Sequence, residues 1–390
     1  MSGRVTRRRF VANTATLVGS ATLSGSRQNT PPATLVSSAT LDGSATLSGS
    51  RQNTAPVAQR SLPAAGSLTD VAGIRVGHFT DARRPTGCTV ILFDRPVTAG
   101  ADYNGSAPGE SLGVLLQPAS PLDRIHGIFL SGGGLMALNA SAGVVRYLEE
   151  KSVGYDWGIP NVRIPVVVGA VIDDLAIGDG RIRVGPDEAY RACQSANSGA
   201  VAEGSVGAGA GATVGKFFVG RGMRGMKGGI GTASRRLGGV TISTLVTVNA
   251  AGDIMDWRTG TIVAGARTPD GRAFARTVDV FARDLESRRA GDDQPLRATT
   301  LTVVATNVAL TKTQLTKLAQ MANTGASRAI NPYHTQSDGD QVLAVSTAAA
   351  ASEVSLTALG AIAADLVADT IVRAVKTATG IPGWAAVRDL

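Results

Sequence analysis

One hydroxyl and two carboxylates stand at the starts of two segments whose patterns are typical of β-strands. Thr299 begins residues 299–306, a run rich in β-branched side chains that predicts a buried strand. Asp338 and Asp340 flank a glycine in a turn pattern before residues 342–347, which predict another strand. A buried strand alone implies no chemistry, but two carboxylates at a strand entrance are candidates for acid–base chemistry. A solvated turn is the alternative for both aspartates.

A helix is predicted between these two strands. Thr311 and Gln314 have the spacing of a capping box, in which each side chain accepts from the other residue's backbone N–H. The apolar residues that follow recur on one helical face: Leu315, Leu318, Ala319 and Ala322. The chain must then turn back to reach Asp338.

This part of the chain resembles the self-processing L-aminopeptidase/D-esterase family of N-terminal-nucleophile hydrolases, and especially its 6-aminohexanoate-oligomer (nylon oligomer) endohydrolase branch. Further matches follow the family's order at residues 70–78, 86–89, 207–216, 226–231 and 248–249. The resemblance extends over about residues 67–385. Several separate motifs make it more specific than any single glycine-rich run.

The resemblance implies amide hydrolysis by an N-terminal threonine. The Thr299 hydroxyl would attack the carbonyl of Ala298, the chain would divide between these residues, and the freed α-amine would become the base for its own hydroxyl. An α-amine has an ordinary pKa of about 7.7–8.0, which is close enough to neutrality for that role. Asp338 and Asp340 would hold and orient the amine.

Two more side chains are candidates for the site. Asn249 corresponds to an asparagine that helps to stabilise the oxyanion, although a strand-end asparagine can also cap backbone groups. Lys216 ends the glycine-rich residues 207–216, which fail as a phosphate-binding loop because Phe217 follows the lysine. We interpret this run as close backbone packing beside a buried lysine, which could supply fixed positive charge or a perturbed pKa. An ordinary surface lysine is the alternative.

Two residues depart from the family's pattern. Ala298 stands where the nylon-oligomer branch has asparagine and other branches have glycine, so the rate of self-cleavage is expected to change. Met136 stands where the family usually has an aromatic residue of the substrate site. A thioether in place of a ring gives a more adaptable apolar wall.

Strand and helix patterns alternate along residues 67–390 without regular βαβ spacing, which indicates a mixed α/β layered domain. Strands are predicted at residues 68–78, 89–93, 124–130, 162–172 and 241–249, and helices after Gly134, at 186–193 and at 352–377. The resemblance implies a four-layer αββα sandwich, one domain built from two autocleaved fragments, 67–298 and 299–390. It also implies a homo-oligomer of these αβ heterodimers, such as a tetramer.

The N-terminus carries most of the net charge of +8, because residues 1–60 contain seven Arg and one Asp. The small remaining charge does not favour nucleic-acid binding. Residues 7–9 are three arginines before an apolar run at 11–23, a pattern typical of a twin-arginine export signal, with a basic tail as the alternative. Residues 20–30 recur at 44–54 in a polar composition that predicts disorder. We therefore interpret residues 1–66 as signal and linker.

The predicted location is periplasmic or secreted, and cytoplasmic if the signal is not used. No apolar run reaches the roughly 18 residues of a membrane span, so no stable membrane insertion is expected. No cofactor or metal is expected, because the two cysteines, Cys88 and Cys193, and the three histidines lack metal-ligand spacing. Both cysteines are predicted to be buried. The histidines, His78, His126 and His334, are predicted to satisfy core or turn hydrogen bonds.

The sequence therefore predicts an exported, self-processing amide hydrolase. Its expected substrates are small linear amides, such as 6-aminohexanoate oligomers, or short peptides. The alternatives are an aminopeptidase, β-peptidyl aminopeptidase or esterase of the same family. A catalytically silent binding protein that retains the fold is the alternative from another class, and Ala298 is the residue in its favour.

Overall fold

The computed structural model describes residues 66–288, 298–350 and 354–390. All of them belong to the unit Arg60–Leu390. The twin-arginine pattern, the repeat after it and residues 289–297 before the predicted cleavage site lie outside the described residues.

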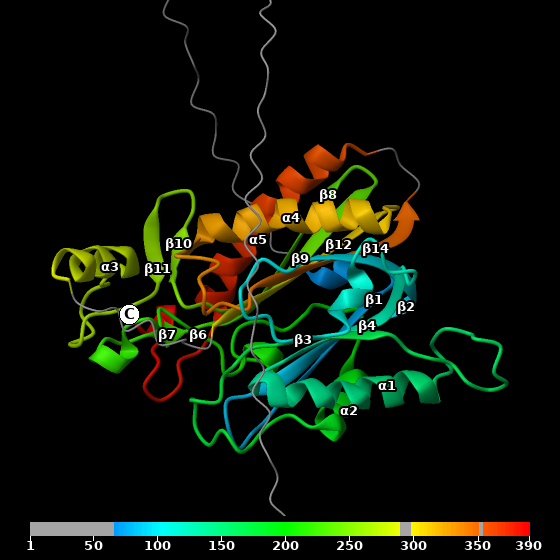
Figure 1. Ribbon diagram of the computed structural model, residues 1–390, viewed down its shortest axis with the longest axis horizontal. Coiled ribbons are helices and arrows are strands. Elements are labelled where there is room, and N and C mark those ends of the chain that lie inside the picture. The colour runs from blue at the N-terminus through cyan, green and yellow to red at the C-terminus, as the bar shows by residue number, and fades with distance from the viewer. Residues whose placement is uncertain (1–65, 289–297, 351–353) are drawn as a thin grey trace, which may run out of the picture. The chain divides into compact units, whose positions relative to one another are not determined.

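A large sheet positions Thr299 (Figure 1). Its strands are β1 (Ile74–Thr80), β2 (Gly87–Asp102), β3 (Glu110–Ser111), β4 (Arg124–Ser131), β5 (Val167–Val171), β8 (Gly229–Leu237), β9 (Val240–Asn249), β12 (Thr299–Val308) and β14 (Gln341–Ala350). Their order is β3-β5-β4-β2-β14-β12-β9-β8, and β1 also pairs with β2. The first half of β2 pairs with β1 and β4, whereas its last residues pair with β14. The long β2 therefore joins two sheet layers.

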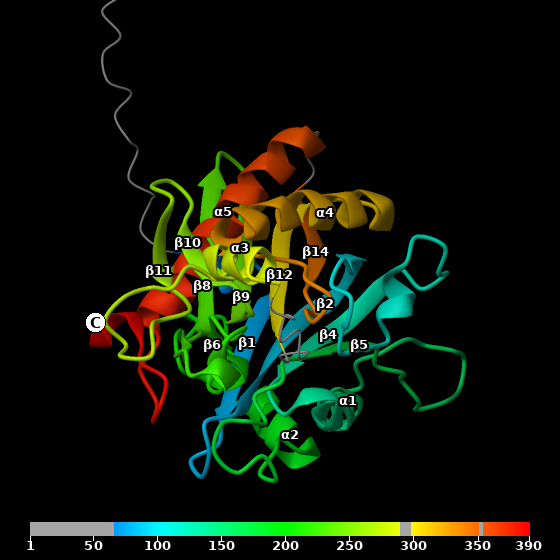
Figure 2. The same ribbon diagram turned by 60° about the vertical axis from the view of Figure 1, so that its left-hand side comes forward.

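Three apolar cores separate the layers of the domain. One core lies between the two sheet layers, because Ile128 of β4 and Val168 of β5 share it with Val303 of β12 and Val345 of β14. A second core packs α4 (Lys312–Ala329) and α5 (Leu356–Thr377) against one sheet layer, and a third packs α1 (Ser141–Glu150) and α2 (Pro186–Ser195) against the other. Figures 1 and 2 show these helix pairs on opposite sides of the strands. The predicted αββα sandwich is confirmed.

The helix after β12 follows its sequence signals. Thr311 is the N-cap of α4, its side chain accepts from the Gln314 N–H at 3.3 Å, and Gln314 Oε1 accepts from the Thr311 N–H at 2.9 Å. The four apolar residues predicted on one face are buried against the sheet and α5: Leu315, Leu318, Ala319 and Ala322. Truncating a buried leucine of this kind to alanine costs about 2–5 kcal/mol. The capping box and the apolar stripe therefore fix where the chain turns back toward Asp338.

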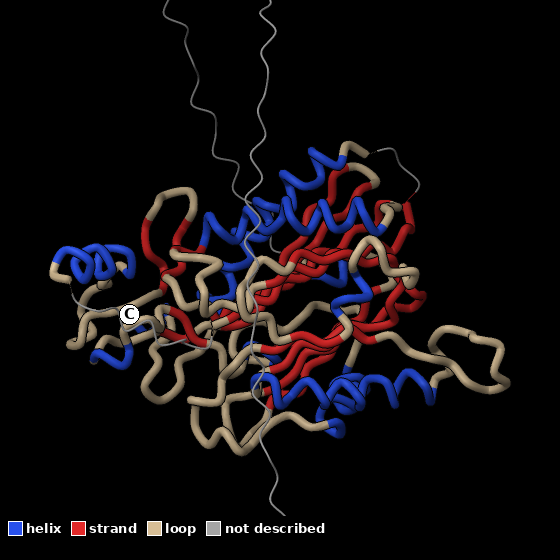
Figure 3. The backbone as a smooth tube through the Cα atoms, in the orientation of Figure 1, coloured by secondary structure: helices blue, strands red, loops and turns tan. Residues whose placement is uncertain are grey.

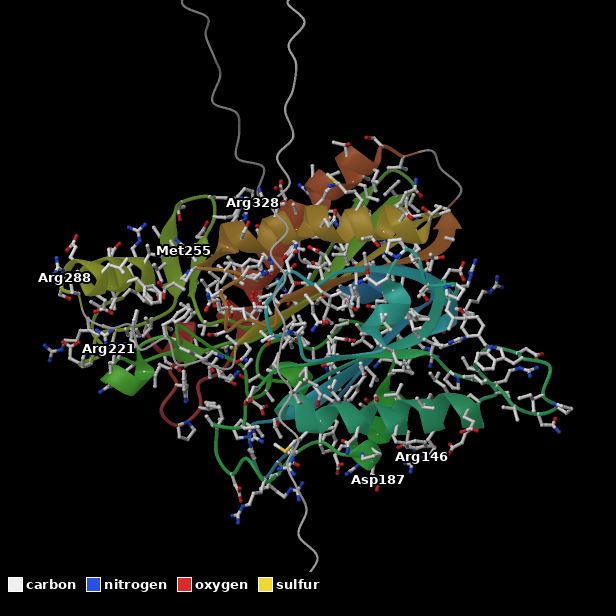
Figure 4. The ribbon with its side chains drawn as sticks, in the orientation of Figure 1. Arg146, Asp187, Arg221, Met255, Arg288 and Arg328 are labelled. Carbon is white, nitrogen blue, oxygen red and sulfur yellow. The ribbon has the colours of Figure 1, made fainter. Side chains whose placement is uncertain are left out.

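Ion pairs join the helices within each outer layer. Arg146 of α1 lies 3.0 Å from Asp187 of α2, and both are labelled in Figure 4. Arg328 of α4 lies 2.9 Å from Asp365 of α5. These side chains are partly or largely exposed, so each pair contributes only about 0–1 kcal/mol. The buried apolar faces hold the helices in place.

Several element boundaries differ from the sequence prediction. Residues 68–78 form a 3₁₀ turn, Leu68–Asp70, before β1, and Gly73 between them has φ +87°. The strand predicted at residues 162–172 is limited to β5, because Pro165 cannot donate to a strand partner. The strand predicted at residues 89–93 is part of the longer β2. Helix α5 begins at Leu356, after the N-cap Ser355.

Smaller elements lie beside the large sheet (Figure 3). They are β6 (Thr213–Val214), β7 (Met226–Lys227), β10 (Asp253–Asp256), β11 (Thr261–Ala264), β13 (Ile330–Asn331) and α3 (Thr277–Glu286). Strands β6 and β7 form a two-stranded ladder, and β11-β10-β13 form a three-stranded sheet. Across the described ranges, no helix has the length and apolar character needed to cross a membrane.

Candidate active site

The backbone brings Thr299 beside three of the predicted site residues. Strand β12 lies between β9 and β14, and Thr299 is the register partner of Asn249 at the end of the antiparallel β9. Strand β14 is parallel to β12, and Ala298 forms a parallel bridge with Asp338 just before it. The start of β12, the end of β9 and the approach to β14 therefore meet at one edge of the sheet. Asp340 directly precedes β14 at this edge.

The peptide between Ala298 and Thr299 is buried and its carbonyl oxygen accepts two hydrogen bonds. Thr299 Oγ1 donates to Ala298 O at 2.6 Å, and the Gly339 N–H donates to the same oxygen at 2.9 Å. Thr299 is only 6% exposed and Ala298 only 2%. A hydroxyl thus lies against the carbonyl of its own preceding residue, while a backbone N–H polarises that carbonyl.

At position 339, only glycine fits between the Thr299 hydroxyl and the Ala107 carbonyl. A Cβ at Gly339 would lie 2.8 Å from Thr299 Oγ1 and 2.5 Å from Ala107 O. The loop is fixed on both sides of the glycine, because the Ala107 N–H donates to Asp338 O and the Gly105 N–H donates to Asp340 O. The glycine between the two aspartates is therefore needed for close approach to the threonine.

The two aspartates are buried and hold different partners. Asp340 Oδ1 accepts from the Thr300 N–H at 2.6 Å, one residue beyond the expected amine. Asp338 Oδ2 accepts from both the N–H and the hydroxyl of Thr335, at 2.8 and 2.7 Å. The solvated-turn alternative is wrong, because Asp338 is 2% exposed and Asp340 is 1% exposed.

Burial raises the pKa of Asp338 to about 6, and the neighbouring Asp340 carboxylate raises it further, against hydrogen bonds from Thr335 and the charge of Lys216. Asp338 Oδ1 is buried and has no hydrogen-bond partner among the residues that the structure describes. A carboxyl with a raised pKa and an unsatisfied oxygen is typical of groups that take part in proton transfer.

Lys216 and Asn249 contact each other directly. Lys216 Nζ donates to Asn249 O at 3.0 Å and to Asn249 Oδ1 at 2.9 Å. The Thr213 N–H also donates to Asn249 Oδ1 at 3.0 Å, and Asn249 Nδ2 donates to Asp173 O at 3.2 Å. These contacts fix the orientation of the Asn249 amide, with Oδ1 toward Lys216 and Nδ2 toward Asp173.

Lys216 is buried, so the surface-lysine alternative is wrong. Desolvation lowers the pKa of its ammonium to about 7, although Asp338, Asp173 and Asp340 each act in the opposite direction. Near neutral pH this lysine can therefore be either charged or neutral. It can stabilise developing negative charge in one form and accept a proton in the other.

The glycine-rich residues 207–216 pack as expected against the neighbouring backbone. A Cβ at Gly209 would lie 2.4 Å from Ile230 N, and one at Gly215, where φ is +66°, would lie 2.2 Å from Ala266 N. Lys227, which the sequence analysis did not identify, binds the backbone carbonyls of this loop. Its buried Nζ donates to Gly209 O at 2.8 Å and to Ala212 O at 2.9 Å, and burial lowers its pKa to about 7.

The sequence analysis also did not identify a buried ion pair at Asp174, the residue after Asp173. Arg84 and Asp174 are both fully buried and hydrogen-bonded to each other. Asp174 Oδ1 also accepts from the Gly133 N–H at 2.9 Å. The sequence offers no signal for this pair, because Arg84 follows another arginine and the two partners are 90 residues apart. Removing either partner would leave an uncompensated buried charge.

Met136 lies on the 3₁₀ helix Gly134–Ala140, which starts beside Asp173. The Gly134 N–H donates to Ile172 O, so this helix is attached to the strand end that leads to Asp173. The Met136 side chain is 52% exposed. The structure thus places Met136 at the surface next to the site, whereas the other predicted residues are buried within it.

The two cysteines and three histidines lie where the sequence predicts, buried or hydrogen-bonded. Cys88 and Cys193 are free and buried, as predicted. The histidines make the expected hydrogen bonds: His78 with Thr89, His126 with the Val166 N–H, and His334 with Asn323. In residues 66–288, 298–350 and 354–390, no group of three or more His, Cys, Asp or Glu side chains could hold a metal ion.

Comparison with known proteins decides the family. The family model for peptidase family S58 matches residues 66–388. The chain belongs to peptidase family S58. An uncharacterized aminopeptidase of Mycobacterium tuberculosis (strain H37Rv) is 36% identical over 350 residues, which are 83% of this chain and 97% of the relative. A 6-aminohexanoate-oligomer endohydrolase of Agromyces sp. is 33% identical over 323 residues, 79% of this chain and 85% of the relative.

Solved structures share the fold of this chain. The L-aminopeptidase D-Ala-esterase/amidase of Ochrobactrum anthropi, described as a variant of the Ntn hydrolase fold, superposes with a TM-score of 0.58. The match covers 82% of this chain and 88% of that chain at 22% identity. The chain therefore has the Ntn hydrolase fold. Membership of the S58 family makes it an amide hydrolase.

Proposed function

We propose that the chain is a self-processing hydrolase whose nucleophile is Thr299 after cleavage of the Ala298–Thr299 bond. The observation that carries the proposal is the contact of Thr299 Oγ1 with Ala298 O while the Gly339 N–H binds the same oxygen. The arrangement places a nucleophile and an oxyanion donor on one peptide bond. The fragments would be residues 67–298 and 299–390, after a signal and linker at residues 1–66.

Self-cleavage would begin with attack of Thr299 Oγ1 on the carbonyl carbon of Ala298. The hydroxyl proton passes to a base and then to the leaving amide nitrogen of Thr299, so the amide becomes an ester. Water hydrolyses this ester, which yields the Ala298 carboxylate and a free Thr299 hydroxyl and α-amine. The Gly339 N–H stabilises the oxyanion on Ala298 during this step. Asp338, with a pKa raised to about 6, bridges to Ala298 and is the carboxylate proposed as this base.

The processed site would then hydrolyse substrate amides by the same chemistry. The Thr299 α-amine accepts the hydroxyl proton and gives it to the leaving amine, and water releases the acyl group from Thr299. Asn249 and Lys216 lie on the side of Thr299 formed by β9 and would stabilise the substrate oxyanion. Asp340, which binds the Thr300 N–H in the uncut chain, would orient the new α-amine together with Asp338.

The proposed substrates are small linear amides, such as 6-aminohexanoate oligomers, or short peptides. The endohydrolase relatives support the oligomers. A second candidate is aminopeptidase activity, because the mycobacterial relatives at higher identity carry that name. The exposed Met136 would line the substrate site in place of the aromatic residue usual in the family, and would give that wall a different shape.

We also propose export by the twin-arginine route and assembly as a homo-oligomer.

Substitutions at two adjacent threonines test the proposed nucleophile. Thr299→Ser keeps a hydroxyl and is expected to retain slower processing and hydrolysis, whereas Thr299→Ala is expected to remain one chain without activity. Thr300→Val is the matched control. It keeps the β-branched shape and removes a buried hydroxyl that has no hydrogen-bond partner among the described residues. Gel analysis and amide hydrolysis are the readouts. If Thr300→Val blocks cleavage and Thr299→Ala does not, the nucleophile is misassigned.

A further inference from the structure

The second oxygen of the Asp340 carboxylate faces His334. Asp340 Oδ2 accepts from the His334 N–H at 3.3 Å and lies 3.3 Å from His334 Nδ1. The ring contact is within ion-pair distance but is not aligned as a hydrogen bond in the uncut chain. His334 has φ +56°, a left-handed conformation that is uncommon outside glycine, although histidine, asparagine and aspartate adopt it more often than other residues. In this conformation the imidazole ring faces Asp340.

The other ring nitrogen of His334 contacts a buried asparagine of α4. His334 Nε2 lies 3.0 Å from Asn323 Nδ2, and Asn323 is 4% exposed. Asn323 Nδ2 also donates to Asp102 Oδ2 at 2.8 Å, and Asn323 Oδ1 accepts from the Tyr333 hydroxyl at 2.9 Å. Asp102 Oδ2 receives a second amide, from Asn104 at 2.7 Å, so it acts as an acceptor. These partners fix which way the Asn323 amide points.

The amide orientation determines the tautomer of the histidine. Asn323 Nδ2 can only donate, so His334 Nε2 must be the acceptor and carry no proton. A neutral imidazole then carries its proton on Nδ1, the nitrogen that faces Asp340 Oδ2. A proton on Nε2 would put two donors against each other at 3.0 Å. Asp102 fixes the Asn323 amide, and Asn323 in turn fixes the His334 tautomer. As a result, the His334 Nδ1–H faces the Asp340 carboxylate as a donor.

We infer that His334, held as the Nδ1–H tautomer by Asn323, is a positioning residue that anchors Asp340 Oδ2 so that Oδ1 faces the start of β12. This inference rests on the proposed function, because the start of β12 matters only if Thr299 reacts. Asp340 needs such an anchor since the buried Asp338 carboxyl lies nearby and opposes its charge. The Tyr333 ring, whose centroid is 3.9 Å from that of His334, holds the imidazole from one side.

The tautomer can be measured without any catalytic turnover. The full chain with Thr299→Ala is labelled with ¹⁵N-histidine, and its three histidines are assigned by comparison with the same chain carrying His334→Asn. We expect the His334 ¹⁵N shifts of a neutral ring with protonated Nδ1 and unprotonated Nε2. A ring protonated at Nε2, alone or together with Nδ1, would overturn the inference. Failure of self-processing leaves this measurement unaffected.

Two substitutions at His334 separate positioning from folding. Asparagine tolerates the left-handed backbone and can place its Nδ2 where the imidazole has Nδ1, whereas glycine tolerates the backbone and supplies no donor. We expect His334→Asn to process within about threefold of wild type and His334→Gly to process about ten- to hundredfold more slowly, because glycine removes the donor that closes to a hydrogen bond with the Asp340 carboxylate as Thr299 reacts. His126→Asn, which keeps an acceptor for the Val166 N–H, is the control.

Thermal unfolding of the same variants shows whether a slow one is simply misfolded. The inference stands if His334→Gly unfolds at the wild-type temperature but processes slowly, and if His334→Asn restores the rate. It is overturned if His334→Gly processes at the wild-type rate, or if His334→Asn is as slow as His334→Gly at equal stability.

Discussion

Replacement of Lys216 by methionine should change how the stability of the fold depends on pH. Methionine has a similar unbranched shape but cannot be protonated. Desolvation lowers the pKa of Lys216 to about 7 in the folded chain, from its ordinary value of 10.5. At a pH between these two pKa values, the unfolded chain binds more protons at this residue than the folded chain does. The lysine therefore makes the free energy of unfolding rise with pH. The methionine variant lacks this contribution.

The magnitude follows from the two pKa values. For one group titrating at about 7 when folded and at 10.5 when unfolded, the free energy of unfolding rises by about 2–3 kcal/mol between about pH 7.5 and about pH 9.5. Lys227 and the buried cysteines also titrate differently in the two states, but they are present in both proteins. Their effects cancel in the difference between wild-type and Lys216→Met chains.

Guanidinium unfolding at a series of pH values measures this difference. Both proteins carry Thr299→Ala, so that each unfolds as one chain. Lys317→Met, at an exposed lysine of α4, is the control and should track the parent at every pH. If the unfolding free energies of Lys216→Met and its parent stay parallel between about pH 7.5 and about pH 9.5, Lys216 does not titrate there and cannot alternate between charged and neutral forms near neutrality.

Three further outcomes are expected. Gly339→Ala should slow processing at least about tenfold, because the new Cβ would lie 2.8 Å from Thr299 Oγ1; Gly239→Ala, with nothing within 4 Å, should process normally. Processing of Gly339→Ala at the wild-type rate would show that this contact is unimportant. 6-Aminohexanoate oligomers should release amine-bearing products whether or not their amino termini are blocked; cleavage of free-terminus peptides alone would favour the aminopeptidase. Arg7→Lys with Arg8→Lys should retain the protein in the cytoplasm, and an unchanged distribution between cell fractions would exclude the twin-arginine signal.

The sequence was most informative where local patterns determine the structure. The β-branched run, the Thr311 capping box and the glycine between two aspartates correctly predicted β12, α4 and the approach to β14. The strand limits predicted at residues 162–172 were wrong, because an apolar run with an internal proline leaves those limits undefined. Pairing with β3 and β4 determines where β5 begins and ends.

Long-range contacts in the site could not be predicted from local pattern. Lys216 was identified from its glycine-rich run and Asn249 through the resemblance. Their hydrogen bond depends on how the glycine-rich residues 207–216 pack against β9. The contact of Asp173 with Asn249 joins residues 76 apart in the sequence, and the Arg84–Asp174 pair joins residues 90 apart. Burial and partner identity decide the properties of these charged side chains, and neither is encoded in their immediate neighbours.

The covalent state of the purified wild-type chain tests the central claim most directly. Intact-mass spectrometry with N-terminal sequencing should find a C-terminal fragment of 92 residues, 299–390, that begins Thr-Thr-Leu. Selective blocking of its α-amine should abolish amide hydrolysis, because that amine is the proposed base. A wild-type protein that remains one chain through Ala298 and Thr299, yet hydrolyses amides at its full rate, would contradict the account.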